Sequence, residues 1–203
     1  FRRSAFCRAE HLPSLIRERM TNRLFDEAAL RGKVRIEAVD GTDAIALDAI
    51  ARLVRCLPAA IANADDSEAR MELMMGTIEA SMSMWKGLGI AHALSMPFDD
   101  LGLHHGTLVG VIMPEALRFV LPSVSDERRA NLARALGCGA DEIPEALDRL
   151  NRQIGLPAGL GAMGVPVDSL GHAGKVAAGT PFNHFAARSG TAEEFEAMAH
   201  AAF

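Results

Sequence analysis

The residues in this sequence that are best suited to chemistry are its seven histidines, at positions 11, 92, 104, 105, 172, 184 and 200. Imidazole nitrogen binds zinc, iron, cobalt and nickel, although a lone histidine is usually structural. One pair stands out: His92 lies on a helical stretch bracketed by glycines, and His105 follows where a loop can return it beside His92. Two adjacent imidazoles would supply half of a metal site. On spacing alone, buried and hydrogen-bonded histidines are the commoner outcome.

Composition narrows the class of protein that could carry such a pair. The chain has 203 residues, 49% of them hydrophobic, with a mean hydropathy of +0.12, which is typical of one globular domain. A net charge of −5 and an aromatic content of 5%, with no Tyr, argue against nucleic acid as a partner. No apolar run reaches the roughly 18 to 20 residues that span a membrane. We therefore expect neither nucleic acid nor a membrane as a partner.

The cysteines and the start of the chain bear on its location. Cys7, Cys56 and Cys138 are an odd number without motif spacing, which is typical of reduced thiols and favours a cytoplasmic protein. The chain opens on Phe1 with three arginines close behind, a pattern typical of a transit peptide or of a chain cut from a longer protein. We expect the second.

The elements that must position the histidines are predicted to be helices. Helical spacing indicates one over Asp43–Leu57, with Pro58 where it should stop or bend. A second, over Ser67–Trp85, carries a methionine-rich stripe that we expect to be buried in a bundle. Leu103–Val120 is strongly apolar, and Pro114 predicts a kink or two helices at an angle.

The C-terminal part is also predicted to be helical. Ser125 or Asp126 can cap one helix, Asp141 can open the next, and Thr191 with Glu194 forms a capping box for the last. Only Lys33–Val39 alternates as a strand would, and it has no partner. The glycine-rich stretch 155–180 lacks the preceding strand that a dinucleotide-binding fingerprint needs. The pattern therefore predicts an all-α fold of eight or nine helices.

The stretch KGLGIAHALSMPFDDLGLHHGTLVGVIMPEALRF, residues 86–119, resembles the motif of the iron-containing (group III) alcohol dehydrogenases. In that family G-x-x-H-x-x-x-H-P is followed by a loop and then by H-G. The resemblance covers about residues 42–170, and the tail more loosely. It implies that residues 41–203 form the family's C-terminal helical metal-binding domain, which is dehydroquinate synthase-like, after a divergent segment 1–40. The family's N-terminal Rossmann-like domain is not found in this sequence.

The resemblance also implies a metal and a reaction. By position, His92 and His105 match two of the family's four metal ligands, for a divalent ion that is usually iron or zinc. That ion polarises the oxygen of an alcohol or aldehyde substrate while hydride passes between substrate and nicotinamide cofactor. NAD or NADP would bind only if the missing domain were supplied, and we assign no catalytic or cofactor-binding residue to this chain.

Two departures from the family pattern bear on activity. The second histidine of the motif is Met96 here, which removes a proton-shuttling group. The family's D-x-x-x-H ligand pair is missing from the start of the helical domain, and upstream of Thr42 its nearest formal echo is Cys7 with His11. His104 could orient a ligand or be a surface histidine at a helix start, and Lys86, Asp99 and Asp100 could line the cleft or be solvated. We assign no role to His184.

Two functions follow from these observations. The first is one half of an NAD(P)-dependent alcohol dehydrogenase, inactive as an isolated chain. The second is a non-catalytic remnant that keeps the helical bundle for stability or association and has lost the complete metal site. A homo-oligomer is compatible with both, because removing a partner domain exposes apolar surface.

Overall fold

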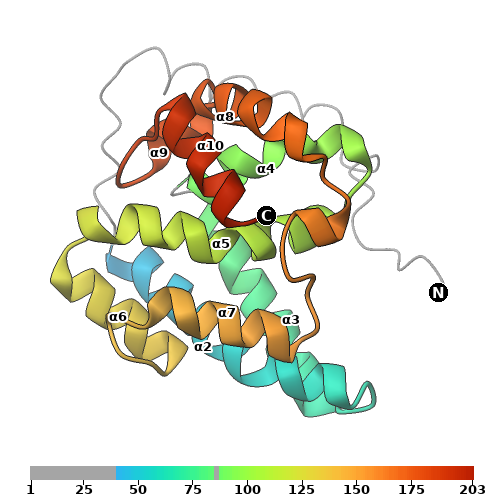
Figure 1. The fold of residues 1–203 in the computed structure, drawn as a ribbon. Helices are drawn as coiled ribbons and strands as arrows, with labels where there is room; N and C mark the ends of the chain where they lie inside the picture. Colours follow the sequence, from blue (N-terminus) through green and yellow to red (C-terminus); the bar gives the residue numbers. More distant parts are fainter. Residues whose placement is uncertain (1–39, 85–86) are drawn as a thin grey trace, which may run out of the picture. The chain divides into compact units, whose positions relative to one another are not determined.

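The computed structural model describes residues 40–84 and 87–203, which belong to the second of the chain's two units, residues 38–203. Within these residues every regular element is helical, in nine α-helices labelled α2 to α10 and several short 3₁₀ turns (Figure 1). The predicted all-α fold is therefore confirmed for the described part. The strand expected at Lys33–Val39 and the Cys7 and His11 echo lie outside it.

The main core is built by four helices: α4 (Ile90–Ser95), α5 (His105–Val120), α8 (Leu170–Ala178) and α10 (Ala192–Ala201). Seven of its large side chains are at most 1% exposed, namely Leu94, Phe98, Leu108, Ile112, Leu160, Leu170 and Phe195. Helices α8 and α10 approach so closely that a Cβ at Gly174 would lie 2.5 Å from the carbonyl oxygen of Ala192. Glycine is therefore needed at this crossing.

Residues 105–120 form a single helix, α5, so the chain does not start a new helix at Pro114, which was one of the two alternatives predicted there. Proline cannot donate to the carbonyl four residues earlier, which here belongs to Gly110. The side-chain amide of Asn151 donates to that oxygen at 2.8 Å. Asn151 comes from α7 (Ile143–Gln153), which packs on α5. A neighbouring helix thus satisfies the carbonyl that Pro114 leaves unpaired, and α5 can continue.

Helix α2 (Asp40–Ala62) likewise runs through Pro58, where the sequence predicted a stop or bend. Its partner is α3 (Ser67–Ser83), against which it packs extensively. The turn of α2 that follows Pro58 is largely exposed, and Ile61 in it is 54% exposed.

The methionine-rich stripe of α3 is not buried, and that prediction is wrong. Its members Met71, Met74, Met75, Ile78 and Met82 are 41–58% exposed. The buried positions of α3 are instead the small residues Ala69 and Gly76. A Cβ at Gly76 would lie 3.2 Å from Leu53 and 3.3 Å from a backbone oxygen of α2, so the small residues set how closely the two helices pack. The larger apolar side chains are left on the opposite face.

Several predicted helix ends are confirmed. Helix α6 (Asp126–Leu136) begins after Ser125, whose hydroxyl accepts from the amide of Arg128, and it ends at Gly137 in the left-handed conformation. Helix α10 has the complete Thr191 and Glu194 capping box. Within 155–180 the chain forms 3₁₀ turns and then α8, with no strand among these residues. Among the described residues no helix is both long enough and apolar enough to cross a bilayer.

Candidate metal centre

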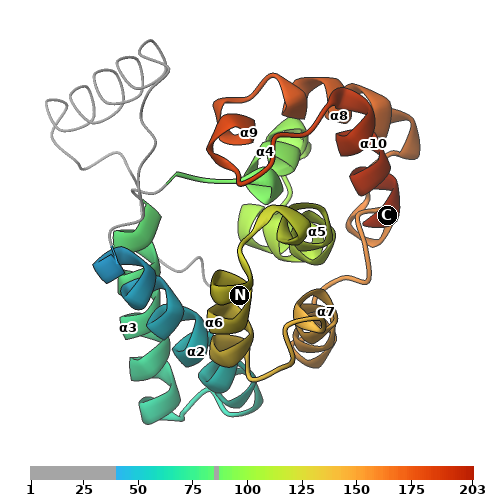
Figure 2. The same cartoon turned by 90° about the vertical axis from the view of Figure 1, so that its left-hand side faces the viewer.

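His92 is held by a short and almost completely buried helix. Helix α4 contacts α5, α8 and the five-residue helix α9 (Pro181–Phe185), as Figure 2 shows. Five of its six residues are buried, and His92 is the half-buried exception. The Ser95 hydroxyl, itself fully buried, donates to the carbonyl of His92 at 2.9 Å. The backbone that carries His92 is therefore fixed by the core.

His105 is returned to His92 by a 3₁₀ turn. The turn, Met96–Leu101, is anchored by Phe98, which is 1% exposed in the main core. It ends at Gly102, whose φ of +68° favours glycine. Residue 105 is then the first of helix α5. A buried anchor and a left-handed reversal thus bring the start of α5 back to α4.

The centroids of the His92 and His105 rings are 5.2 Å apart, and the ring planes make an angle of 55°. Two imidazoles that share a tetrahedral metal through nitrogen atoms at about 2.1 Å have centroids about 5 Å apart. The separation of the two ring centroids therefore matches that of two histidine ligands of one metal ion. Sequence spacing predicted this juxtaposition, while binding of a metal by the pair stays a prediction.

The protonation of His92 favours its use as a ligand. Burial lowers the pKa of His92, His105 lowers it further, and Asp99 partly opposes the shift. A metal binds only the neutral imidazole, because the proton occupies the nitrogen lone pair. A lowered pKa thus keeps His92 available for a metal at pH values where an ordinary histidine would begin to take up a proton.

The described residues supply no third ligand in place. No group of three or more His, Cys, Asp and Glu side chains within residues 40–84 and 87–203 is arranged to hold a metal. Cys7 and His11 lie outside these residues, so their predicted contribution stays a prediction. The donor set that the structure shows fits half of the four-ligand site that the family resemblance implies.

The other polar candidates differ in their roles. His104 caps helix α5: its Nδ1 accepts from the amide of Thr107 at 3.2 Å, which is a structural role. Asp99 lies 3.5 Å from Nδ1 of His105, measured from its Oδ1, and Asp100 is exposed. Met96 is 40% exposed and has no proton to exchange. His184 is exposed on α9, and Lys86 lies outside the described residues.

Sequence reasoning missed the part of the chain around α9. The ring of Phe182 meets the His92 ring edge-on with centroids 6.2 Å apart. The next residue, Asn183, is 3% exposed and bonds the carbonyls of Ala178 and Gly190 and the amide of Gly190. This buried amide fixes the corner that places Phe182. The sequence PFNHF gave no periodic signal from which this could be found.

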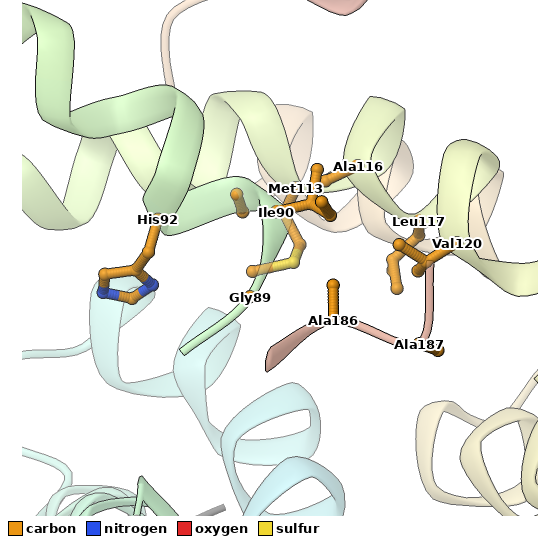
Figure 3. Close-up of a pocket in the computed structure, with 10 residues that line it drawn as sticks. Gly89, Ile90, His92, Met113, Ala116, Leu117, Val120, Ala186 and Ala187 are labelled. Carbon is orange, nitrogen blue, oxygen red and sulfur yellow. The ribbon is translucent and has the colours of Figure 1, made fainter. Parts of the chain in front are cut away.

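An apolar pocket of about 210 Å³ adjoins His92 (Figure 3). It lies between the start of α4, the second half of α5 and residues 186–187. Its lining includes Ile90, Met113, Leu117, Val120 and Ala186. His92 lies at one end of the pocket, and among the described residues that line it, His92 is the only titratable one. The arrangement suits a carbon chain whose polar end lies near the histidine.

Comparison with known proteins finds one family and a consistent set of relatives. Residues 29–203 match the C-terminal domain of the Fe-containing alcohol dehydrogenase family. The 4-hydroxybutyrate dehydrogenase of Cupriavidus necator is 39% identical over 153 residues, which are 70% of this chain and 39% of that protein. The NAD-dependent methanol dehydrogenase of Bacillus methanolicus is 31% identical, over 70% of this chain and 40% of that protein.

Solved structures agree with the sequence comparison. A 1,3-propanediol oxidoreductase superimposes with a TM-score of 0.76 at 26% identity, over 80% of this chain and 45% of that one. The iron-containing alcohol dehydrogenase of Thermococcus thioreducens gives 0.72 at 27% identity, over 81% and 44%. The chain thus spans less than half the length of each of these four relatives.

Proposed function

We propose, from the premise that this chain belongs to the Fe-containing alcohol dehydrogenase family, that it is the metal-binding half of an NAD(P)-dependent alcohol dehydrogenase. The observation that carries the proposal is the pair of His92 and His105 rings at 5.2 Å. In this proposal residues 41–203 are the metal-binding domain, and residues 1–40 are a separate, divergent segment. The isolated chain does not turn over an alcohol.

The described residues would supply metal binding but not cofactor binding. His92 and His105 hold a divalent ion, iron or zinc, whose chemistry is to polarise the oxygen of the bound alcohol or aldehyde. Hydride transfer also needs a nicotinamide positioned against the substrate carbon, and the described residues contain no strand-turn-helix site for its phosphates. Activity therefore depends on a cofactor-binding domain.

The pocket beside His92 supports an alcohol or aldehyde as the substrate. An oxygen held near the two imidazoles would leave the carbon chain directed along the apolar lining from Ile90 toward Val120. Burial of that chain contributes about 0.8 kcal/mol per methylene group. A pocket of this kind favours a short unbranched skeleton over a charged one.

The test is to join the chain to a cofactor-binding half. The chain is fused behind the cofactor-binding half of the Cupriavidus necator relative, loaded with Fe(II) or Zn(II), and assayed for alcohol-dependent reduction of NAD and NADP. We expect turnover that is abolished in the His92→Ala and His105→Ala variants. A properly folded, metal-loaded fusion without turnover on any short alcohol would contradict the proposal.

A second candidate, a non-catalytic helical remnant with an association role, is favoured by two observations. Only two of the four expected ligands lie within the described residues, and the exposed methionine-rich face of α3 is apolar surface that a homo-oligomer would bury. Light scattering on the purified chain checks this. A concentration-dependent oligomer that Met74→Glu dissociates, together with no metal binding, would favour the remnant.

A further inference from the structure

We infer that Asp99 is a positioning residue for His105: its carboxylate holds the Nδ1–H of the imidazole and leaves Nε2 facing the metal. The inference rests on the proposed function, since it concerns how this chain prepares one of its two proposed ligands. Nothing in the family motif singles out this position, which lies in the loop between the two histidines.

The contact is the first observation. Oδ1 of Asp99 lies 3.5 Å from Nδ1 of His105, within ion-pair range and slightly beyond a direct hydrogen bond. Nδ1 is the ring nitrogen of His105 nearest the carboxylate, so the other ring nitrogen, Nε2, is the one left to bind a metal ion. Metal-binding histidines commonly donate their second N–H to a carboxylate, which fixes the tautomer and the orientation of the ring.

The backbone holds Asp99 at this place. Its neighbour Phe98 is 1% exposed in the core, and the amide of Gly102 donates to the carbonyl of Asp99 at 3.3 Å. The same turn therefore sets the return of the chain to His105 and the position of the carboxylate. The side chain itself is 45% exposed and can close the remaining gap without moving the helices.

Metal binding would strengthen the contact. A bound cation draws electron density from the imidazole, so its Nδ1–H becomes a stronger donor to a carboxylate. The His105 ring is 47% exposed, and its described neighbours include Asp99 and the ring of His92. His92 differs, because it is half-buried and contacts the Phe182 ring. Packing thus orients one imidazole, and Asp99 orients the other.

The test uses the whole 203-residue chain and compares Asp99→Asn and Asp99→Glu with Asp100→Asn, which removes the neighbouring exposed carboxylate. In the metal-free protein, nitrogen NMR of the His105 ring reports its tautomer. We expect the Nδ1–H tautomer in the unaltered chain and in Asp100→Asn, and the Nε2–H tautomer in Asp99→Asn. An unchanged tautomer in Asp99→Asn would overturn the inference.

Calorimetric titration with Co(II) then measures the effect on binding. We expect Asp99→Asn to weaken Co(II) about 10- to 100-fold, with partial recovery in Asp99→Glu and no change in Asp100→Asn. The visible spectrum of bound Co(II) should be the same in all variants, because the ligands are retained. A changed spectrum in Asp99→Asn would show direct ligation and overturn the positioning role.

The two proposals fail in different ways. If the unaltered chain binds no Co(II) but Asp99→Asn still shifts the His105 tautomer, the proposed function fails and the role of Asp99 in orienting the ring stands. If the unaltered chain binds Co(II) and Asp99→Asn binds it equally well, the inference about Asp99 fails and the proposed function stands.

Discussion

The core that carries the two histidines and the α2–α3 pair bury their residues in opposite ways. In the core, α4 is surrounded by α5, α8 and α9, and its large side chains are inside. In the α2–α3 pair, the buried residues of α3 are the small Ala69 and Gly76, and the methionines of α3 stay outside. A helical apolar stripe thus shows which face can be buried, while the number of neighbouring helices decides whether it is.

The largest effect should come from the core. Leu94→Ala removes a side chain that is 0% exposed in α4, two residues from His92. We expect a loss of about 2–5 kcal/mol in the free energy of unfolding, from lost burial and the cavity that remains. Urea denaturation followed by circular dichroism measures it. A loss below about 1 kcal/mol would mean that this region is no better packed than α3.

A smaller effect tests how α5 passes through Pro114. Asn151→Ala leaves the carbonyl of Gly110 without the amide that satisfies it, and should cost about 1–2 kcal/mol. In a Pro114→Ala background the helix regains its own donor to Gly110, so the same Asn151→Ala change should cost less. The double-mutant cycle in urea denaturation measures the coupling. An equal loss of stability from Asn151→Ala in both backgrounds would mean that Asn151 does not compensate for the hydrogen bond that Pro114 cannot donate.

The half-buried His92 should give the core a pH dependence. Its pKa is lowered in the folded chain, chiefly by burial, so the unfolded chain takes up the proton first as pH falls. The contribution of neutral His92 to the free energy of unfolding is complete above the pKa of histidine in the unfolded chain, about 6.5. It is lost as pH falls toward the lower pKa of His92 in the folded chain. Between pH 8 and 5 His92→Gln should therefore lose less stability than the unaltered chain. His200→Gln, an exposed histidine on α10, is the control and should behave like the unaltered chain.

The smallest effect is expected on the exposed, methionine-rich face of α3. Met74 is 56% exposed, so Met74→Gln should change the free energy of unfolding by less than about 0.5 kcal/mol. A change on the buried face of α3, Gly76→Leu, should be far more costly, because a Cβ added at this position would lie 3.2 Å from Leu53. A large loss for Met74→Gln at low protein concentration would mean that the methionine face is buried after all.

The sequence predicted the features that depend on residues close to one another along the chain. The capping box at Thr191, the Ser125 cap and the return of His105 to His92 follow from residue types at fixed spacing. The path through Pro114 could not be predicted, because it depends on Asn151 from another helix. The exposure of the α3 methionines was missed for a related reason. Their spacing shows that they share one face of the helix, whereas the tertiary fold decides whether another element packs on that face.

The site shows the same division. His92 and His105 could be identified from the motif, whereas Phe182 and Asn183 come from a stretch without periodicity, and the contact of Asp99 with His105 depends on the turn between them. The other two ligands cannot be read from the start of the helical domain, where the family has its D-x-x-x-H pair, because residues 40–91 contain no histidine.

The most direct test of the central claim is the metal content and affinity of the purified chain, by elemental analysis and calorimetric titration with Fe(II) and Zn(II). Our account predicts binding of one ion per chain that is lost in both His92→Ala and His105→Ala. Binding that both variants retain, or no binding by the unaltered chain, would contradict the assignment of this histidine pair as half of a metal site.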